Sequence, residues 1–213
     1  MRKPIIVVID GANGVGKSTI IKKMKQKILE NNLTVDVLRQ PFYNVNRDIL
    51  LSGELNYLDA YNIFYKDRVK LLSEKVINSN CDIVLLDRSF IASIFHQGIE
   101  HDDLCNLKKI INDSLRIYKR LGIKINIGVN LYSDPNIISQ RHSKKDDNEF
   151  DFRDTLDIKK IKSELYGYKL AWNIGIMIGL VNNFRQYENN INKDIDKIVN
   201  HLLKDILELL KKE

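Results

Sequence analysis

Residues 5–19 read IIVVIDGANGVGKST, and this stretch decides the fold of the chain. Its first five residues are apolar and mostly β-branched, as in a strand that is buried on both faces. A glycine-rich turn follows with the spacing G-x-x-x-x-G-K-S, from Gly11 to Ser18, and we expect a helix from Ser18 to about Asn31. A strand, this turn and a helix in that order predict a phosphate-binding loop.

The residue types in this loop suit the phosphates of a nucleotide such as ATP. Glycines let backbone N–H groups approach phosphate oxygens without a Cβ in the way, and the N-terminus of the next helix favours an anion. Lys17 should reach the β- and γ-phosphates, and the Ser18 hydroxyl should lie where Mg²⁺ binds. The alternative is an accidental tight turn. The residues expected to bind ATP are Gly11, Ala12, Asn13, Gly14, Val15, Gly16, Lys17, Ser18 and Thr19.

The composition favours one compact domain. The 213 residues are 44% hydrophobic, which suits a single α/β domain over residues 1–213 with a sizeable core. The net charge is +6, but the lysines are scattered among acidic residues without an arginine-rich stripe. We therefore expect a solvated surface, with part of the excess charge explained by polyanionic small substrates, and no nucleic-acid partner.

The sequence also bears on the compartment. No apolar run reaches the roughly 18 residues of a membrane span, and the chain leads straight into the first strand without room for a signal peptide. Cys81 and Cys105 lack the spacing of metal ligands, so we expect reduced thiols and no zinc. These features indicate a cytoplasmic protein with no membrane partner.

Strand and helix patterns alternate along the rest of the chain. Further strands are expected at 34–38, 82–87, 123–131 and 174–181, the last from an apolar run. Helices are expected at about 56–78, 90–97, 103–121, 156–171 and 192–210, the last capped by Asn192. This alternation predicts a three-layer α/β fold in which helices flank both faces of a five-stranded parallel sheet.

Two of the expected strands end in charged residues. Asp87 and Arg88 follow one apolar strand, and Arg39 follows another, two residues before Pro41. Because ligands sit beyond the carboxyl ends of strands in such sheets, these side chains should line the rim of an active site. A carboxylate in the position of Asp87 is suited to reach the shell of a nucleotide-bound Mg²⁺. The alternative for Arg39 is a plain cap of the strand end.

A polar segment from Arg141 to Asp154 is expected to be a mobile lid. It is dense in charge, and its basic side chains are Arg141, His142, Lys144, Lys145 and Arg153. The alternative is a solvated surface with no part in catalysis.

Four landmarks, in their order and spacing, resemble the thymidylate kinase family of P-loop nucleoside monophosphate kinases. Phe64 and Arg68 match an aromatic residue and an arginine on one helix, and residues 39–41 read RQP where the family has Arg-Glu-Pro. Residues 87–98 read DRSFIASIFHQG, against Asp-Arg-Tyr/His-x-x-Ser-x-x-Ala-Tyr-Gln-Gly in the family, and residues 141–153 fall at its basic lid. The likeness spans most of the chain and implies the P-loop kinase fold and a homodimer. GTPases are disfavoured, because no Asn-Lys-x-Asp motif occurs.

The resemblance implies roles for the residues on the ATP side. Lys17 and the loop amides would hold the β- and γ-phosphates, while Ser18 and, through water, Asp87 would hold Mg²⁺. The loop carries Gly14 and no arginine, so the cation that stabilises the moving phosphoryl group should come from the lid. Arg141 is the first candidate, followed by Arg153, Lys144 and Lys145. The expected catalytic residues are Lys17, Asp87, Arg88 and Arg141.

The resemblance also implies roles on the acceptor side. Arg39 and Arg88 would grip the 5′-phosphate of the acceptor. Phe64 would stack on a pyrimidine, Arg68 would hydrogen-bond the carbonyl edge of that base, and Gln97 would line the same pocket. The plainer alternative for Phe64 is a place in the core.

Two departures from the family pattern leave the acceptor open. Asn13 stands where the family has Asp or Glu facing the sugar 3′-OH; an amide can still bind the substrate but loses the charge, which admits a modified or different pyrimidine. Ser89 replaces an aromatic residue or His and looks more like deoxynucleoside kinases. Tyr166 and Tyr168 both fall near a tyrosine that the family has at the pocket, and the register does not choose between them.

Gln40 bears on whether the acceptor is a nucleoside or a nucleotide. A nucleoside 5′-OH needs a general base, and deoxynucleoside kinases use the Glu of a Glu-Pro after the second strand. Gln40 stands at this position and cannot take a proton. A monophosphate acceptor is already an anion and needs only positioning and charge neutralisation.

The expected function is therefore transfer of the ATP γ-phosphoryl group to dTMP or a related, even modified, deoxypyrimidine monophosphate. Mg²⁺ is the expected cofactor. One alternative is a deoxynucleoside kinase, which Ser89 supports and Gln40 opposes. The other is a catalytically silent protein that binds nucleotide as a sensor.

Overall fold

The computed structural model describes residues 3–40, 42, 55–145 and 154–212. Its strands form one five-stranded sheet in the order β2-β3-β1-β4-β5, and every neighbouring pair is parallel. The strands are β1 (Ile5–Gly11), β2 (Val35–Arg39), β3 (Ile83–Asp87), β4 (Ile125–Tyr132) and β5 (Val181–Glu188). The predicted five-stranded parallel sheet is confirmed.

Strand β1 lies at the centre of the sheet, between β3 and β4. All of its residues are buried, which explains an apolar run without polar alternation. Asp87 at the end of β3 pairs with Ile9 on one side and with Arg39 on the other. The carboxyl ends of β1, β2 and β3 therefore meet at one edge, which is where ligands bind in open parallel sheets.

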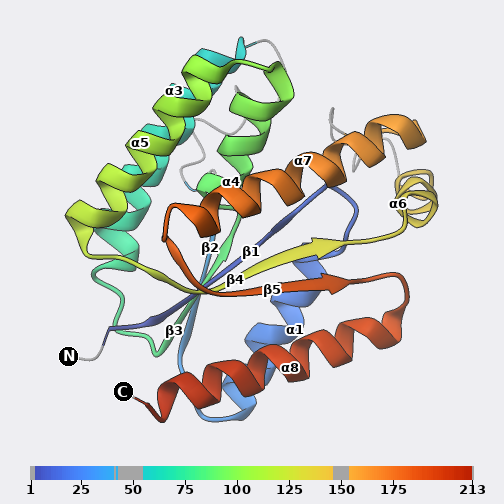
Figure 1. Cartoon of the computed structure of the whole chain (residues 1–213). Coiled ribbons are helices and arrows are strands. Elements are labelled where there is room, and N and C mark those ends of the chain that lie inside the picture. The colour runs from blue at the N-terminus through green and yellow to red at the C-terminus, as the bar shows by residue number, and fades with distance from the viewer. Residues whose placement is uncertain (1–2, 41, 43–54, 146–153, 213) are drawn as a thin grey trace.

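Helices cover both faces of the sheet (Figure 1). On one face, α1 (Lys17–Glu30) packs against α8 (Asn192–Leu210). The other face carries α3 (Tyr57–Leu71), α4 (Phe90–Ser93), α5 (Leu104–Leu121) and α7 (Ile158–Met177). The short helix α6 (Pro135–His142) lies beyond the end of β4. The predicted three-layer arrangement is confirmed.

Two of the expected helices continue into wider turns. Helix α3 is followed by a π-helical turn η1 (Leu72–Val76), and α4 by a second one, η2 (Ile94–Gly98). A 3₁₀ turn η3 (Ile99–His101) completes the second stretch. The ranges predicted as single helices, 56–78 and 90–97, are thus composite.

Side-chain caps explain several helix starts. The side chain of Asn56 accepts the N–H groups of Leu58 and Asp59 at the start of α3, as expected for an N-cap. The expected cap of the last helix is wrong by one residue, because α8 starts at Asn192 and Ile191 is its N-cap. Asp194 explains the shift, since its carboxylate accepts the backbone N–H of Ile191 at 3.0 Å.

The last strand was predicted in the wrong place. Residues 174–177 belong to the end of α7, and the strand is Val181–Glu188. The apolar run was misleading because Met177 is exposed and Gly175 packs against Ile91 and Phe90 within a helix contact. The true strand is at the edge of the sheet and pairs only with β4, so its sequence VNNFRQYE is half polar.

The polar segment expected at 141–154 is divided in the structure. Arg141 and His142 form the end of α6, whereas residues 146–153 lie outside the described part of the chain. Among the described residues, no helix combines the length and the apolar composition needed to cross a bilayer.

Gly167 lets α7 approach η2 closely, and its replacement tests this packing. A Cβ on Gly167 would lie 2.2 Å from Cε2 of Phe95, which is buried. Overpacking costs about 1–3 kcal/mol, whereas Gly→Ala in a helix gains up to about 1 kcal/mol. We expect Gly167→Ala to lower the free energy of unfolding by about 1–2 kcal/mol in urea titrations. The control is Ser163→Ala at an exposed site of α7; equal stability of both variants would contradict the packing.

Candidate active site

The predicted phosphate-binding loop connects β1 to α1. Gly11, Gly14 and Gly16 all have positive φ, at 146°, 78° and 92°, which explains why glycine stands at these positions. Gly16 is the N-cap residue of α1, so the loop ends at the helix N-terminus. The local conformation is that of an anion-binding site.

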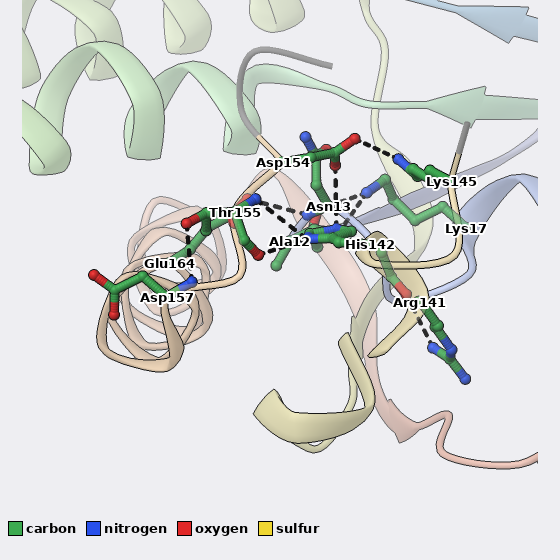
Figure 2. A network of polar contacts seen from close by, with 12 residues as sticks. Ala12, Asn13, Lys17, Arg141, His142, Lys145, Asp154, Thr155, Asp157 and Glu164 are labelled. Carbon is green, nitrogen blue, oxygen red and sulfur yellow. Dashed lines mark hydrogen bonds and ion pairs between the residues drawn. The ribbon is translucent and has the colours of Figure 1, made fainter. Parts of the chain in front are cut away.

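The outward polar groups of this loop are bound by side chains from distant elements. The N–H of Asn13 donates to Oε1 of Glu164 on α7 at 3.1 Å. The carbonyl of Gly14 accepts from Arg141 on α6 at 2.9 Å, and that of Val15 accepts from Asn189 after β5 at 2.7 Å. Figure 2 shows α6 and α7 converging on the loop.

Lys17, the first residue of α1, folds back over the loop. Its Nζ donates to the carbonyl oxygens of Gly11 at 2.8 Å and Ala12 at 2.7 Å, and its side chain is buried (Figure 2). Burial, followed by the positive charge of Arg88, lowers the pKa of Lys17 from 10.5 to about 8. The ammonium group is therefore held in the loop that was predicted to bind phosphate.

Asp10 is a charged residue of the site that the motif search did not single out. It is fully buried at the end of β1, where its carboxylate accepts the N–H of Gly11, at 3.2 Å, and the N–H of Ser89, at 3.0 Å. Burial raises its pKa, while the charges of Arg88 and Lys17 act in the opposite direction. The available signal was an acid inside an otherwise apolar strand, directly before the loop.

Both the backbone N–H and the hydroxyl of Ser89 are hydrogen-bonded to the carboxylate of Asp10. Its Oγ lies 3.2 Å from Oδ2 of Asp10 and accepts the N–H of Ile91 at 3.2 Å, which caps α4. The serine that departs from the family pattern thus ties β1 to the start of α4.

Asp87 and Ser18 have the properties needed to hold a magnesium ion. Oδ1 of Asp87 is buried and has no hydrogen-bond donor among the described residues, while Oδ2 lies 3.4 Å from Nε of Arg39. Ser18 is exposed in the first turn of α1. A hard cation with oxygen ligands and retained waters suits a lone carboxylate oxygen and a hydroxyl at neighbouring chain segments.

Arg88 lies between the phosphate loop and α7. Its backbone adopts φ 74°, a left-handed conformation that is unusual for a residue with a side chain. One terminal nitrogen donates to Oδ1 of Asn13 at 2.8 Å, and the other lies 3.4 Å from the hydroxyl of Tyr168. The structure therefore brings two of the predicted substrate-binding residues, Arg88 and Asn13, into direct contact.

A small open pocket lies beside Arg88. Its walls come from β2, α3 and the β3–η2 stretch, and they include most of the residues predicted to bind the acceptor. They are Gln40, Phe64, Arg68, Arg88, Ser89, Ala92, Ser93, His96 and Gln97. Arg39 is not among them; its side chain is half exposed at the adjoining strand end and pairs with Asp87.

Arg68 is buried at this pocket, with 3% of its surface exposed. Burial lowers its pKa, but a guanidinium remains charged in proteins. Its described partners are uncharged: Oε1 of Gln40 at 3.2 Å, the carbonyl of Ser89 at 3.2 Å and Oγ of Ser93 at 2.7 Å. Gln40 also donates to the carbonyl of Phe64 at 3.2 Å, so both ends of its amide are used.

The remaining pocket wall comes from η2, and η2 contacts α7. Oε1 of Gln97 is buried without a hydrogen-bond donor among the described residues. The hydroxyl of Tyr168 lies 3.2 Å from Nε2 of His96. Of the two tyrosines between which the sequence left the choice open, Tyr168 is buried and contacts His96, whereas Tyr166 is 63% exposed. His96 lies in the pocket wall.

The described cations of the predicted lid have different partners. Arg141 donates to the carbonyls of Gly14 and Asn189, both at 2.9 Å, so its described bonds anchor the backbone. Lys145 pairs with the buried Asp154, and Lys144 is exposed. Arg153 lies outside the described residues. Which cation assists the transfer stays a prediction.

Comparison with known proteins agrees with the fold and the loop. The sequence model of the family described as "Thymidylate kinase" matches residues 9–174. A thymidylate kinase of Finegoldia magna is 30% identical over 105 residues, which cover 45% of this chain and 51% of that protein. The chain thus spans about half the length of that relative.

Two further relatives match over longer stretches. A thymidylate kinase of Leptospira interrogans is 29% identical over 175 residues, which cover 76% of this chain and 80% of the relative. One of Thermoanaerobacter pseudethanolicus is 25% identical over 169 residues, covering 75% and 80%. Because the family model spans most of the chain, including the phosphate loop and the acceptor pocket, the chain belongs to the thymidylate kinase family of ATP-dependent phosphotransferases.

Proposed function

We propose that the chain transfers the γ-phosphoryl group of ATP to dTMP or to a related deoxypyrimidine monophosphate, modified ones included. The observation that carries this proposal is the meeting of two cationic groups at one sheet edge. Lys17 lies in the loop after β1, and Arg88 lies after β3 beside the acceptor pocket. A triphosphate on the first and an acceptor phosphate near the second would face each other, as in-line transfer requires.

Each side of the site has a distinct part in the proposal. The loop amides and Lys17 bind the ATP phosphates. Ser18 and, through water, Asp87 would hold Mg²⁺, which would neutralise phosphate charge. Arg39 and Arg88 bind the acceptor phosphate. Its base enters the pocket lined by Phe64, Arg68 and Gln97.

The bonds of Gln40 support a monophosphate acceptor over a nucleoside. Its amide binds Arg68 and the carbonyl of Phe64, and an amide cannot take a proton from a 5′-OH. Ser89, which favoured the nucleoside alternative, is bound to Asp10 and to the start of α4. This structural use weakens the argument from Ser89.

The acceptor is tested by ADP release with dTMP, dUMP, 5-hydroxymethyl-dUMP and thymidine as acceptors. We expect turnover with the monophosphates and none with thymidine, because no general base stands at position 40. Lys17→Ala should abolish turnover, and Lys162→Ala, at an exposed lysine of α7, should not change it. Phosphorylation of thymidine alone would favour a deoxynucleoside kinase, and nucleotide binding without any transfer would favour a silent binding protein.

Arg39 offers a test of acceptor binding with little risk to the fold. Its side chain is 54% exposed and makes one ion pair at 3.4 Å. Hydrogen bonds to charged groups contribute about 1.5–3 kcal/mol, so Arg39→Ala should raise the KM for dTMP about 10- to 100-fold. The melting temperature and the KM for ATP should stay unchanged. Arg120→Ala on α5 is the control, and an unchanged KM for dTMP in Arg39→Ala would remove Arg39 from the acceptor site.

The lowered pKa of Lys17 predicts a pH dependence of ATP binding. With a pKa of about 8, the free protein loses this positive charge as the pH rises through 8. The terminal phosphate of ATP, with a second pKa near ~6, is already ionised there. We therefore expect the Kd for ATP, measured by calorimetry, to rise between pH 7.5 and 9.5 by up to about tenfold per pH unit. Lys17→Arg should show a flat profile over this range; the same rise in that variant would assign the titration to another group.

A further inference from the structure

Helix α6 presents three side chains to a single residue of the phosphate loop. Arg141 donates to the carbonyl of Gly14 at 2.9 Å. A Cβ on Gly14 would lie 2.6 Å from Nε2 of His142 and 3.0 Å from Cγ2 of Ile138. Residues 138, 141 and 142 are spaced so that they share one face of a helix. This face of α6 occupies the space where a side chain of residue 14 would lie.

His142 is the most constrained of the three. It is 1% exposed, and Nδ1 lies 2.9 Å from the carbonyl oxygen and 3.3 Å from the amide nitrogen of Thr155. On the other side of the ring, Nε2 lies 3.1 Å from Oδ1 of the fully buried Asp154. The second oxygen of Asp154 pairs with Lys145. Figure 2 shows the ring between Asp154 and the phosphate loop.

We propose that His142 is a positioning residue for the ATP phosphates: held by Asp154 and Thr155, it fixes Gly14 and thereby the amides of the phosphate loop. The proposal rests on the function proposed above. His142 acts through the loop and is assigned no contact with substrate. The sequence showed only that the loop carries Gly14 and no arginine; the structure shows an imidazole against that position.

The physical reason is the left-handed backbone of Gly14. Glycine at φ 78° has many other accessible conformations, so its geometry must be imposed by its surroundings. Arg141 fixes only the carbonyl, whereas His142 and Ile138 block movement of the Cα. Misplacement of a phosphate-binding group by about 1 Å costs on the order of 10²-fold in rate. The contacts of His142 and Ile138 with Gly14 should therefore affect the affinity for the nucleotide.

The test is a double-mutant cycle with Gly14→Ala and His142→Ala, read out as the Kd for a non-hydrolysable ATP analogue with Mg²⁺. We expect His142→Ala to weaken binding about 10- to 100-fold while the KM for dTMP stays within about twofold. Gly14→Ala should also weaken binding, because its methyl group meets the imidazole. In the double variant the methyl group no longer meets the imidazole, although it still lies near Ile138, so the combined loss should be at least about tenfold smaller than the product of the single losses.

Melting temperatures and a control variant separate a positioning role of His142 from a loss of protein stability. Melting temperatures show how far each variant is destabilised, and all Kd values are taken well below them. His201→Ala, at an exposed histidine of α8, is the matched control and should bind the analogue as the wild type does. If His142→Ala does not fold, His142→Ser, which also removes the ring, takes its place in the cycle.

Each other outcome of these experiments would overturn either the positioning role or the proposed function. Wild-type affinity in a folded His142 variant, or single losses that simply multiply, would overturn the positioning role. Loss of affinity in His201→Ala as large as in His142→Ala would overturn it as well. Absence of analogue binding by the wild type would overturn the proposed function itself, and the positioning role with it.

Discussion

The architecture depends on one constraint at the phosphate loop: a backbone in left-handed turns must have its outward polar groups bound by something other than its neighbours. Glu164, Arg141 and Asn189 supply these bonds from α7, α6 and the residue after β5. The conformation of the loop therefore depends on hydrogen bonds from three distant elements as well as on its own glycines. Their convergence ties the second half of the chain to β1 and leaves the inner face of the loop to a ligand.

The charges of the site are balanced within a small volume. The charge of Arg88 lowers the pKa of Lys17, while the charges of Asp87 and Asp10 raise it. Burial disfavours charge on both Asp10 and Lys17, so each is stabilised mainly by the opposite charges around it. Arg68 differs, because its described partners are all uncharged. A buried cation of this kind favours a ligand that offers strong acceptors.

The sequence predicted what is encoded locally. The glycine spacing and the buried strand predicted the phosphate-binding loop. The alternation of strand and helix patterns predicted the parallel sheet. The edge strand β5 was misplaced because hydrophobicity is a poor guide to a strand with one neighbour, and a nearby helix end was more apolar. The bonds of Arg141 could not be foreseen, since Gly14 is 127 residues away in sequence and no spacing rule connects them. Asp10 carried a local signal, but only the fold shows that its partner is Ser89.

The π-helical turn η2 has a consequence for how the acceptor pocket can diverge. Such a turn accommodates one extra residue in a helix, and here it holds His96 and Gln97 in the pocket wall. Deletion of a single residue at this turn would restore ordinary winding and change which side chains of the turn face the pocket. The wall would then present a different set of groups to the base, while Phe64 and Arg68 on α3 stayed in place. Under the proposed function, length variation at this turn would alter the base preference and leave the phosphate loop untouched.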